Sequence, residues 1–553
     1  MLTENNVKTV KGAKLVIDTL RNLGVDTIFG YPGGIVLDLY DELYKQSDIK
    51  HILVRHEQSA VHAAEGYARK TGKCGVVLVT SGPGATNTVS GIVNAYLDGY
   101  PLVVLTGQVF KGLIGKDAFQ EADICNITQS CTKKVFQITD SANIEKFLEE
   151  AFKCAMAGKK GPVVVDMAKD IFGEKVEVQN HKTTLREPLN KEVCFSEADV
   201  LRLLERLFSA SCPVVVSGGG VLHSEAEDNL YKFVKSLNIP IVSTMMGLGA
   251  YPQDDENYLG MIGIFGDNAA NQLLKDSDLI LSFGARFNDR ITCMFNDVDL
   301  SNKFIQIDIN KNEISRVIPS IDYICADINC LLDKMNKNID SMIKFSKIKD
   351  FSSWLKKATD LKKLNIVRKR NTNLMHSFEV IRKLDEFTKD KSLTFTSEVG
   401  QHQLWAVQNL TFNKERRIFV SGGAGTMGFG FPAAIGACIA NKNLPVVCIT
   451  GDGSFQMSEH ELATCKDYNL NLKIMILNNG YLGMVRQLQE KNCNGRYSQT
   501  KISNPDFLKL AESYGIKALR VSSVSDIDDA LTVAFSTNDT FIIEFLVEPM
   551  ELL

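Results

Sequence analysis

The sequence predicts an α/β protein built from three doubly wound parallel-sheet domains. Short apolar, β-branched runs that end in glycine alternate with segments of helical spacing along the whole chain. In one example, the apolar runs 73–82 and 100–108 flank the helical segment 85–98. Strand, glycine turn, helix and strand in this order are typical of a parallel βαβ unit. The 553 residues leave room for about three or four domains.

Composition and charge exclude several other classes of protein. The hydrophobic fraction of 44% and the charged fraction of 23% are those of an ordinary globular protein. With 62 basic and 66 acidic side chains the net charge is −4, which argues against general nucleic-acid binding. No apolar run approaches the roughly 18 residues that a membrane span needs. The N-terminus lacks the apolar core of a secretory signal. We therefore expect a cytoplasmic protein with no nucleic-acid or membrane partner.

Two polar stretches separate three clusters of predicted strands and helices. Residues 177–193 contain a proline and show no period, which is typical of a surface linker. Residues 336–366 are rich in lysine and are predicted to be a solvated helix and connector. These stretches divide the chain into predicted domains at 1–180, 190–340 and 365–553.

Two loops near the end of the chain predict a magnesium–diphosphate site. Asp452 follows one predicted strand in the sequence Gly-Asp-Gly-Ser, and Asn479 follows the next strand, 27 residues later. Because parallel strands end at the same edge of a sheet, the two side chains can converge. A carboxylate and an amide oxygen suit Mg²⁺, which completes its octahedron with phosphate oxygens and water. Gly453 and Ser454 can present backbone N–H groups to the same phosphate.

A dinucleotide site is the competing interpretation of this region. Residues 423–428 spell GxGxxG after a predicted strand, and Asp452 stands where a ribose-binding acid would be. This interpretation leaves the Gly-Asp-Gly-Ser and Asn-Asn elements without a role, so the magnesium–diphosphate interpretation is favoured. A nicotinamide oxidoreductase and a pair of purely structural turns remain as alternatives. The spacing of Ser458 and Glu461 predicts a capping box for the helix that follows.

The Gly-Asp-Gly motif, followed about 25 residues later by Asn-Asn, resembles the signature of thiamine diphosphate enzymes. Other stretches match in order: FGYPGG (29–34), RHEQSAVHAAEGYAR (55–69), TSGPGATNTVSGI (80–92), IGKDAFQEAD (114–123), MGLGAYP (246–252), LSFGARFNDR (281–290), GQHQLWAVQ (400–408), SGGAGTMGFGFPAAIGA (421–437), LNNGYLGMVRQ (477–487) and GRYSQT (495–500). Together they resemble the acetolactate (acetohydroxyacid) synthase catalytic subunits along nearly the whole chain.

The resemblance implies an activity and a set of cofactors. Enzymes of this family decarboxylate pyruvate on thiamine diphosphate and transfer the hydroxyethyl group to a second 2-oxo acid, in branched-chain amino acid biosynthesis. The resemblance implies Mg²⁺, and an FAD with a structural role. It also implies a homodimer or tetramer with active sites at the subunit interface, and a regulatory small subunit as a further partner. A related thiamine diphosphate carboligase or 2-oxo acid decarboxylase with another acceptor is the alternative. A non-catalytic paralogue is disfavoured, since Glu57 and Asp452 are both present.

The resemblance also assigns roles to individual residues. Glu57 matches the acid that hydrogen-bonds the aminopyrimidine ring and promotes proton removal from the thiazolium carbon. Phe119 and Gln120 match residues that face the substrate across the dimer interface, and Lys133 matches a residue near the entrance. Met427 matches the residue that supports the bent cofactor. Further matches to cofactor contacts are Tyr31, Gly34, Gln401, His402, Gly425, Gly453, Ser454 and Met484. The expected metal ligands are Asp452, Asn479 and Tyr481.

The family's FAD lies mainly on the middle domain. The matching residues are Gly218, Gly219, Gly220, Arg286, Asp289, Arg290, Asp308 and Asp327. A tight turn is the simpler explanation of the three glycines.

One departure from the family bears on the acceptor. Leu488 stands where the family usually has a Trp that packs against the extra methyl of 2-oxobutanoate. One methylene is worth about 1–3 kcal/mol of discrimination. We therefore expect 2-oxobutanoate to be disfavoured as acceptor.

Overall fold

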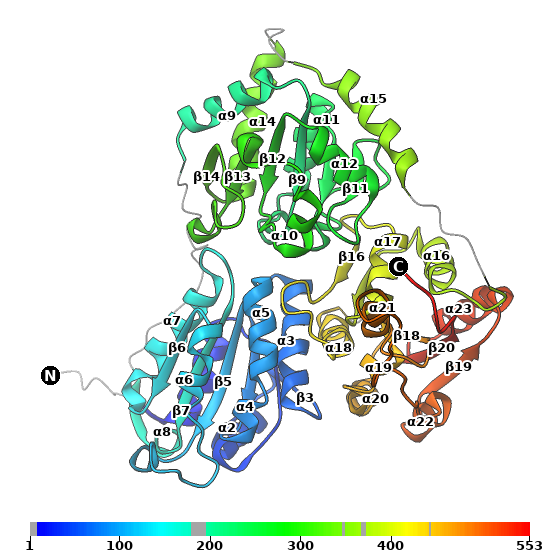
Figure 1. Ribbon diagram of the computed structural model, residues 1–553. Helices are drawn as coiled ribbons and strands as arrows, with labels where there is room; N and C mark the ends of the chain where they lie inside the picture. The colour runs from blue at the N-terminus through cyan, green and yellow to red at the C-terminus, as the bar shows by residue number, and fades with distance from the viewer. Residues whose placement is uncertain (1–7, 179–194, 345–348, 366–371, 442–443) are drawn as a thin grey trace. The chain divides into compact units, whose positions relative to one another are not determined.

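The computed structural model describes residues 8–178, 195–344, 349–365, 372–441 and 444–553 (Figure 1). The chain forms two compact units. The first comprises residues 1–189, 394–403 and 419–550, and the second comprises residues 190–393, 404–418 and 551–553. The described residues contain three six-stranded sheets. The predicted α/β class with three parallel-sheet domains is therefore confirmed.

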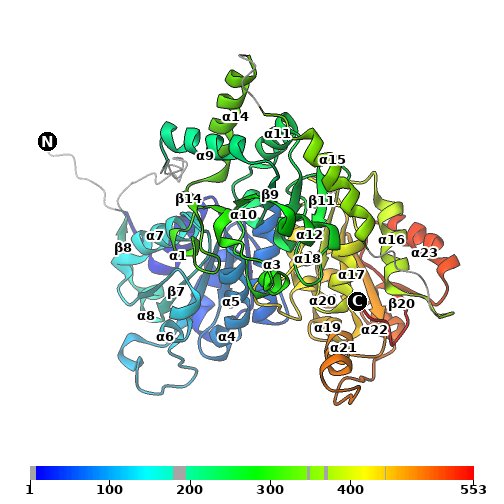
Figure 2. The ribbon, with the colours of Figure 1, turned by 45° about the horizontal axis from the view of Figure 1, so that its top comes forward.

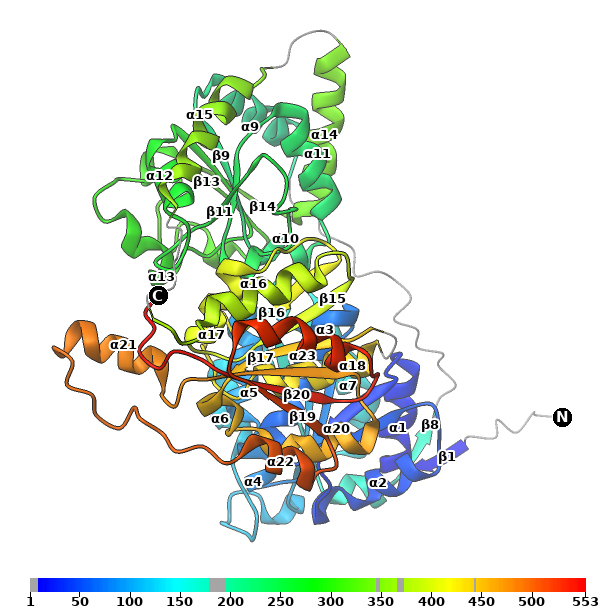
Figure 3. The same cartoon turned by 90° about the vertical axis from the view of Figure 1, so that its right-hand side faces the viewer.

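The first sheet has the strand order β3-β2-β4-β5-β7-β6. Its strands are β2 (Thr27–Gly30), β3 (Lys50–Leu53), β4 (Gly75–Val79), β5 (Leu102–Gln108), β6 (Lys134–Ile138) and β7 (Pro162–Ala168). The helices are α1 (Gly12–Asn22), α2 (Leu37–Tyr44), α3 (Glu57–Thr71), α4 (Pro83–Thr86), α5 (Val89–Asp98), α6 (Ile124–Thr128), α7 (Ile144–Met156) and α8 (Asp170–Gly173). β1 (Lys8–Lys11) and β8 (Lys175–Val178) form a separate antiparallel pair (Figure 3). β4, β5 and β7 are buried along their whole length, as strands covered on both faces are.

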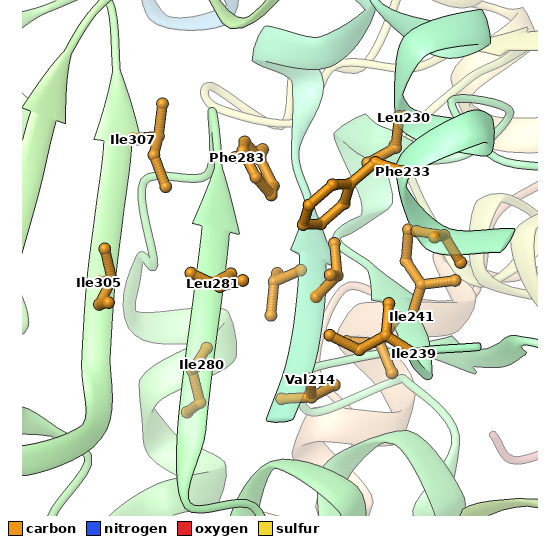
Figure 4. Close-up of a cluster of buried hydrophobic side chains, with 14 of the residues drawn as sticks. Val214, Leu230, Phe233, Ile239, Ile241, Ile280, Leu281, Phe283, Ile305 and Ile307 are labelled. Carbon is orange, nitrogen blue, oxygen red and sulfur yellow. The ribbon is translucent and has the colours of Figure 1, made fainter. Parts of the chain in front are cut away.

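The second sheet has the order β11-β10-β9-β12-β13-β14. Its strands are β9 (Pro213–Ser217), β10 (Ile241–Ser243), β11 (Tyr258–Met261), β12 (Leu279–Phe283), β13 (Phe304–Asp308) and β14 (Asp322–Cys325). The helices are α9 (Glu197–Ser209), α10 (Gly219–His223), α11 (Glu227–Leu237), α12 (Asn268–Asp276), α13 (Asp289–Thr292), α14 (Ile328–Lys344) and α15 (Ser352–Asp360). α14 packs beside α9 and α11 (Figure 2). Aliphatic side chains of the central strands meet Phe233 and Phe283 in the core (Figure 4).

The third sheet has the order β16-β15-β17-β18-β20-β19. Its strands are β15 (Leu393–Ser397), β16 (Arg416–Phe419), β17 (Val446–Gly451), β18 (Leu472–Asn478), β19 (Lys517–Val521) and β20 (Phe541–Leu546). The helices are α16 (Ser377–Thr388), α17 (Gln401–Asn409), α18 (Gly430–Ala440), α19 (Asp452–Phe455), α20 (Leu462–Tyr468), α21 (Gly483–Asn492), α22 (Phe507–Ser513) and α23 (Ile527–Phe535). α21 projects beyond the sheet (Figure 3).

Small residues let α3 pack closely against α18 within the first unit. A Cβ atom on Gly66 would lie 2.0 Å from the carbonyl oxygen of Ala433, and one on Gly436 would lie 1.8 Å from that of Ala63. Both distances are far below van der Waals contact, so only glycine fits at either position. One continuous hydrophobic core therefore extends from the first sheet's helices to the third sheet.

Of the two predicted connectors, the structure describes most of the second and little of the first. Residues 179–193 of the predicted linker 177–193 lie outside the described residues, and its first two residues belong to β8. The lysine-rich stretch 336–366 contains the end of α14 and all of α15, which confirms its helical part. Within the described residues, no helix combines the length and the apolar character that crossing a membrane requires.

Candidate active site

Asp452 and the loop after β18 meet at the carboxyl edge of the third sheet, as the topology predicts. Asp452 begins α19 directly after β17, and its side chain is buried. One carboxylate oxygen accepts the backbone N–H of Gly480 at 2.9 Å. Burial raises the pKa of Asp452, although hydrogen bonds from Asn504 and Gly480 oppose the shift. A bound cation would favour the ionised form of this carboxylate.

Asn504, which no sequence motif singles out, also belongs to this group. Its amide nitrogen donates to the carboxylate of Asp452 at 2.7 Å and to the side-chain oxygen of Asn478 at 2.9 Å. Asn478 in turn donates to Glu544 on β20 at 2.7 Å. Asn504 therefore fixes the orientation of the predicted metal ligand, as an outer-sphere partner does.

The residues after β15 line the same edge. The side-chain amide of Gln401 donates to the side-chain oxygen of Gln487 at 2.7 Å. The amide nitrogen of Asn479 lies 3.5 Å from the side-chain oxygen of Gln401. The side-chain oxygen of Asn479 accepts the backbone N–H of Tyr481 at 2.9 Å. Met484 is half-buried in the first turn of α21. The loops after β15, β17 and β18 thus bring predicted metal and diphosphate ligands to one edge of the third sheet.

The imidazole of His402 is buried at this edge. Burial lowers the pKa of His402 to about 3, so the ring is neutral. A Cβ atom on Gly451 would lie 2.7 Å from its Nδ1, which explains the glycine before Asp452. Among the described residues, Nε2 of His402 has no hydrogen-bond partner. A buried nitrogen of this kind requires an explanation, and a ligand with a polar group would supply one.

The glycine-rich segment after β16 carries Gly425 and Met427. Gly425 is exposed and has a φ of +65°, in the left-handed region that favours glycine. Met427 is partly exposed and is not a member of the hydrophobic core, unlike an ordinary structural methionine. Gly453 and Ser454 lie in the first turn of α19, at the same carboxyl edge of the third sheet as the glycine-rich segment. The arrangement is compatible with a cradle for a diphosphate.

Glu57 is the first residue of α3, at the carboxyl edge of the first sheet. Its carboxylate accepts the amide of Asn87 at 3.0 Å. A Cβ atom on Gly84 would lie 3.4 Å from the other carboxylate oxygen. The exposed residues Tyr31 and Gly34 follow β2 at the same edge. The first domain therefore presents an oriented carboxylate among open loops.

The predicted capping box of Ser458 and Glu461 is wrong. The hydroxyl of Ser458 makes no capping bond, and the carboxylate of Glu461 accepts the backbone N–H groups of Arg55 at 2.9 Å and His56 at 3.2 Å. Glu461 is fully buried. Its long-range partners outcompete a local cap, and it holds the two residues that precede Glu57.

Phe119 and Gln120 lie in the loop after β5. The side chain of Phe119 is 89% exposed. Gln120 has a φ of +60°, and a Cβ atom on Gly82 would lie 2.7 Å from its carbonyl oxygen. The carboxylate of Glu121 accepts the backbone N–H groups of two loop residues. The loop is therefore shaped internally while its aromatic side chain projects outward.

The side chain of Lys133 is bound to the C-terminal end of α7. Its ammonium group donates to the carbonyl oxygens of Cys154 and Ala157, each at 2.5 Å, at the end of α7. Burial lowers the pKa of Lys133. These bonds stabilise the helix terminus, so a role for Lys133 at the site entrance stays a prediction.

The residues predicted to bind FAD all lie at the carboxyl edge of the second sheet. Cβ atoms on Gly218 and Gly220 would lie 2.2 and 2.6 Å from the backbone of Gly284, so close chain packing explains these two glycines. Asp308 accepts the N–H of Asn310, and Asp327 accepts the hydroxyl of Ser224 and the N–H of Cys330. The other members follow β9 or β12: Gly219, Arg286, Asp289 and Arg290.

Comparisons with known proteins agree with this geometry. Three models of thiamine pyrophosphate enzymes match in order: the N-terminal TPP binding domain at residues 10–127, the central domain at 200–335 and the C-terminal TPP binding domain at 398–545. These matches define the class as the thiamine pyrophosphate enzymes.

Curated relatives narrow the class. The acetolactate synthase large subunit of Haemophilus influenzae is 40% identical, over 97% of this chain and 94% of its own. The large subunit of acetolactate synthase isozyme 3 from Escherichia coli is 39% identical, over 96% of this chain and 92% of its own. The chloroplastic acetolactate synthase of Arabidopsis thaliana is 40% identical, over 98% of this chain and 82% of its own. The chain belongs to the acetolactate synthase large-subunit family.

Proposed function

We propose that this chain is an acetolactate synthase that converts two molecules of pyruvate to 2-acetolactate and CO₂. The observation that carries the proposal is the meeting of Asp452 with the Asn479–Gly480 loop, in a chain about 40% identical to acetolactate synthase large subunits. Thiamine diphosphate, when bound, supplies the carbanion that attacks the oxo carbon of pyruvate.

Asp452, Asn479 and the backbone carbonyl of Tyr481 would hold a Mg²⁺ that joins the diphosphate to the third domain. The oxygen donor set suits this hard cation. Two features fit a charged, polar ligand at this edge: the buried carboxylate of Asp452 with its raised pKa, and Nε2 of His402, which has no hydrogen-bond partner in the part of the chain that the structure describes. The backbone of Gly453 and Ser454, at the start of α19, would face the same anion.

Glu57 is the proposed acid–base residue. Asn87 holds one oxygen of its carboxylate and thereby fixes the direction of the other. Glu461 holds the backbone that leads into it. A carboxyl group fixed in this way can take up and return a proton at the cofactor's aminopyrimidine ring. General acid–base transfer of this kind contributes about 10²–10⁴-fold to the rate.

We also propose that the active enzyme is a homodimer or tetramer. Three large apolar side chains of the loop after β5 are exposed on the single chain, those of Phe110, Leu113 and Phe119, and grouped exposed apolar side chains mark interaction sites. Because the relatives are named large subunits, a regulatory small subunit is a further proposed partner.

FAD on the second sheet's edge is proposed as a structural cofactor. Gly219, Arg286 and Arg290 would contact the FAD. Asp308 and Asp327 are less available to it, because each already accepts a backbone N–H group close by in the chain. Purified protein with a flavin absorption band would support this assignment, and colourless protein would contradict it.

Incubation with pyruvate, thiamine diphosphate and Mg²⁺, followed by product identification, tests the proposal. We expect acetolactate that depends on both cofactors. Acetaldehyde as sole product would instead identify a 2-oxo acid decarboxylase. A protein that consumes no pyruvate would contradict both activities.

A further inference from the structure

The glycine-rich segment 420–426 is bound by the first domain of the same chain. Asp98, the last residue of α5, accepts the backbone N–H of Gly423 at 2.7 Å and that of Gly422 at 3.2 Å. Asn94, one turn earlier, accepts the hydroxyl of Thr426 at 3.1 Å. It also accepts the hydroxyl of Ser421. Two side chains of one helix thus hold four residues of the segment.

Buried charges hold these two side chains in place. Arg69 on α3 donates to Asp98 at 2.8 Å, to Glu65 at 3.0 Å and to the carbonyl oxygen of Val420 at 3.0 Å. Glu65 also accepts the amide of Asn94 at 2.9 Å. The side chains of Arg69, Glu65 and Asp98 are at most 2% exposed. The charged side chains that link α3, α5 and the segment are therefore shielded from solvent.

The network is sensitive to the loss of any member. Two carboxylates share one guanidinium, whose carbon lies 4.0 Å from the ring centre of Tyr100. Burial raises the pKa of Glu65, and the charge of Asp98 adds to the effect while Arg69 opposes it. Removing one partner of a buried, hydrogen-bonded charge leaves the others without compensation.

The tip of the segment is open to solvent. Gly423, Ala424 and Gly425 are exposed, and glycine restricts its own backbone poorly. Within the segment, the backbone N–H of Thr426 donates to the hydroxyl of Ser421 at 2.8 Å, and that hydroxyl is itself held by Asn94. The conformation that leads into Met427 therefore depends on the contacts with α3 and α5, while the carboxylate of Glu398 accepts the backbone N–H of Gly428, directly after Met427, at 2.7 Å.

We propose that Asn94 and Asp98 are positioning residues for thiamine diphosphate, which set the 420–426 segment and Met427 of their own chain in the conformation that receives the cofactor. The inference rests on the proposed function. The first domain then has two tasks, since it presents Glu57 and also shapes the third domain's cofactor loop. Asn94 and Asp98 touch no reacting group, so their loss affects cofactor affinity more than the rate at saturation.

Calorimetric titration of the full-length protein with thiamine diphosphate and Mg²⁺ tests this inference. We expect the Kd to rise about tenfold or more in Asp98→Ala and Asn94→Leu, with kcat largely regained at saturating cofactor. Thr426→Val, which removes one hydroxyl, should raise the Kd by a smaller factor than these, whereas Thr426→Ser should restore it. Tyr67→Phe is the control, because it removes a 2.5 Å hydrogen bond from Tyr67 on α3 to Asp26, which takes no part in the network.

Hydrogen exchange in the cofactor-free protein provides a second readout. The amides of Gly422, Gly423 and Thr426 should exchange faster in Asp98→Ala than in the wild type or in Tyr67→Phe. Unchanged exchange and an unchanged Kd in the folded Thr426→Val and Asp98→Ala proteins would overturn the inference alone. A wild-type protein that binds no thiamine diphosphate would overturn the proposed function with it.

Discussion

The amide nitrogen of Asn504 lies 2.7 Å from the carboxylate of Asp452, although 52 residues separate them in the sequence. This bond holds the predicted metal ligand in one orientation. It also brings the loop before α22 to the same sheet edge as the loops after β17 and β18.

Removing the Asn504 side chain should weaken metal binding. Outer-sphere partners of metal ligands typically contribute about 10–100-fold to affinity. We therefore expect Asn504→Ala to need at least about tenfold more Mg²⁺ for half-maximal activity. Titration of activity with Mg²⁺ measures this. Asn538→Ala, an exposed change before β20 at the opposite sheet edge, is the control. An unchanged Mg²⁺ requirement would argue against Asp452 as a ligand.

Glu398 should make the protein less stable as the pH rises. Burial raises the pKa of Glu398 to about 7, against the opposing backbone N–H groups of Phe431 and Gly428. Between the unfolded value of about 4.5 and about 7, the folded protein binds more protons than the unfolded chain, so the free energy of unfolding falls with rising pH.

The comparison of Glu398→Gln with wild type isolates this contribution. The free energy of unfolding, measured with urea, should fall between about pH 5 and about pH 8 in the wild type. This fall should exceed that of the variant by on the order of 2 kcal/mol. Glu386→Gln, an exposed change on α16, is the control for charge. Parallel pH profiles for wild type and Glu398→Gln would refute the assignment.

Leu488 should set the choice of acceptor. It lies on α21 and is 47% exposed, so it offers a small and open apolar contact. We expect Leu488→Trp to raise the yield from 2-oxobutanoate relative to pyruvate by about tenfold, because a larger surface meets the extra methyl. Competition between both acceptors, with both products quantified, measures the ratio. Leu488→Met should leave it near the wild-type value. A strong 2-oxobutanoate preference in the wild type would count against the prediction.

Two inactive variants should complement each other if each active site takes Glu57 from one chain and Asp452 from another. Coexpressed Glu57→Gln and Asp452→Asn chains with different tags form heterodimers in which one site carries both changes and the other carries neither. Random pairing should then restore about a quarter of the wild-type activity, since half of the dimers have one intact site of two. Sites contained within single chains would give no recovery.

The alternation of apolar runs and helical segments is enough to predict three parallel sheets, and the topology then implies that Asp452 and Asn479 converge at one sheet edge. Long-range partners could not be inferred in this way. Ser458 and Glu461 have the spacing of a local cap, but the backbone N–H groups that Glu461 accepts lie more than 400 residues earlier. Asp98 looks like an ordinary helix end, and its bonds to Gly422 and Gly423 depend on how two domains pack.

The proton-transfer role of Glu57 is tested most directly by Glu57→Gln. With Mg²⁺ and thiamine diphosphate saturating, acetolactate formation from pyruvate should fall by about 10²–10⁴-fold while calorimetry still shows bound cofactor. Turnover at the wild-type rate by a fully cofactor-loaded Glu57→Gln protein would contradict the account.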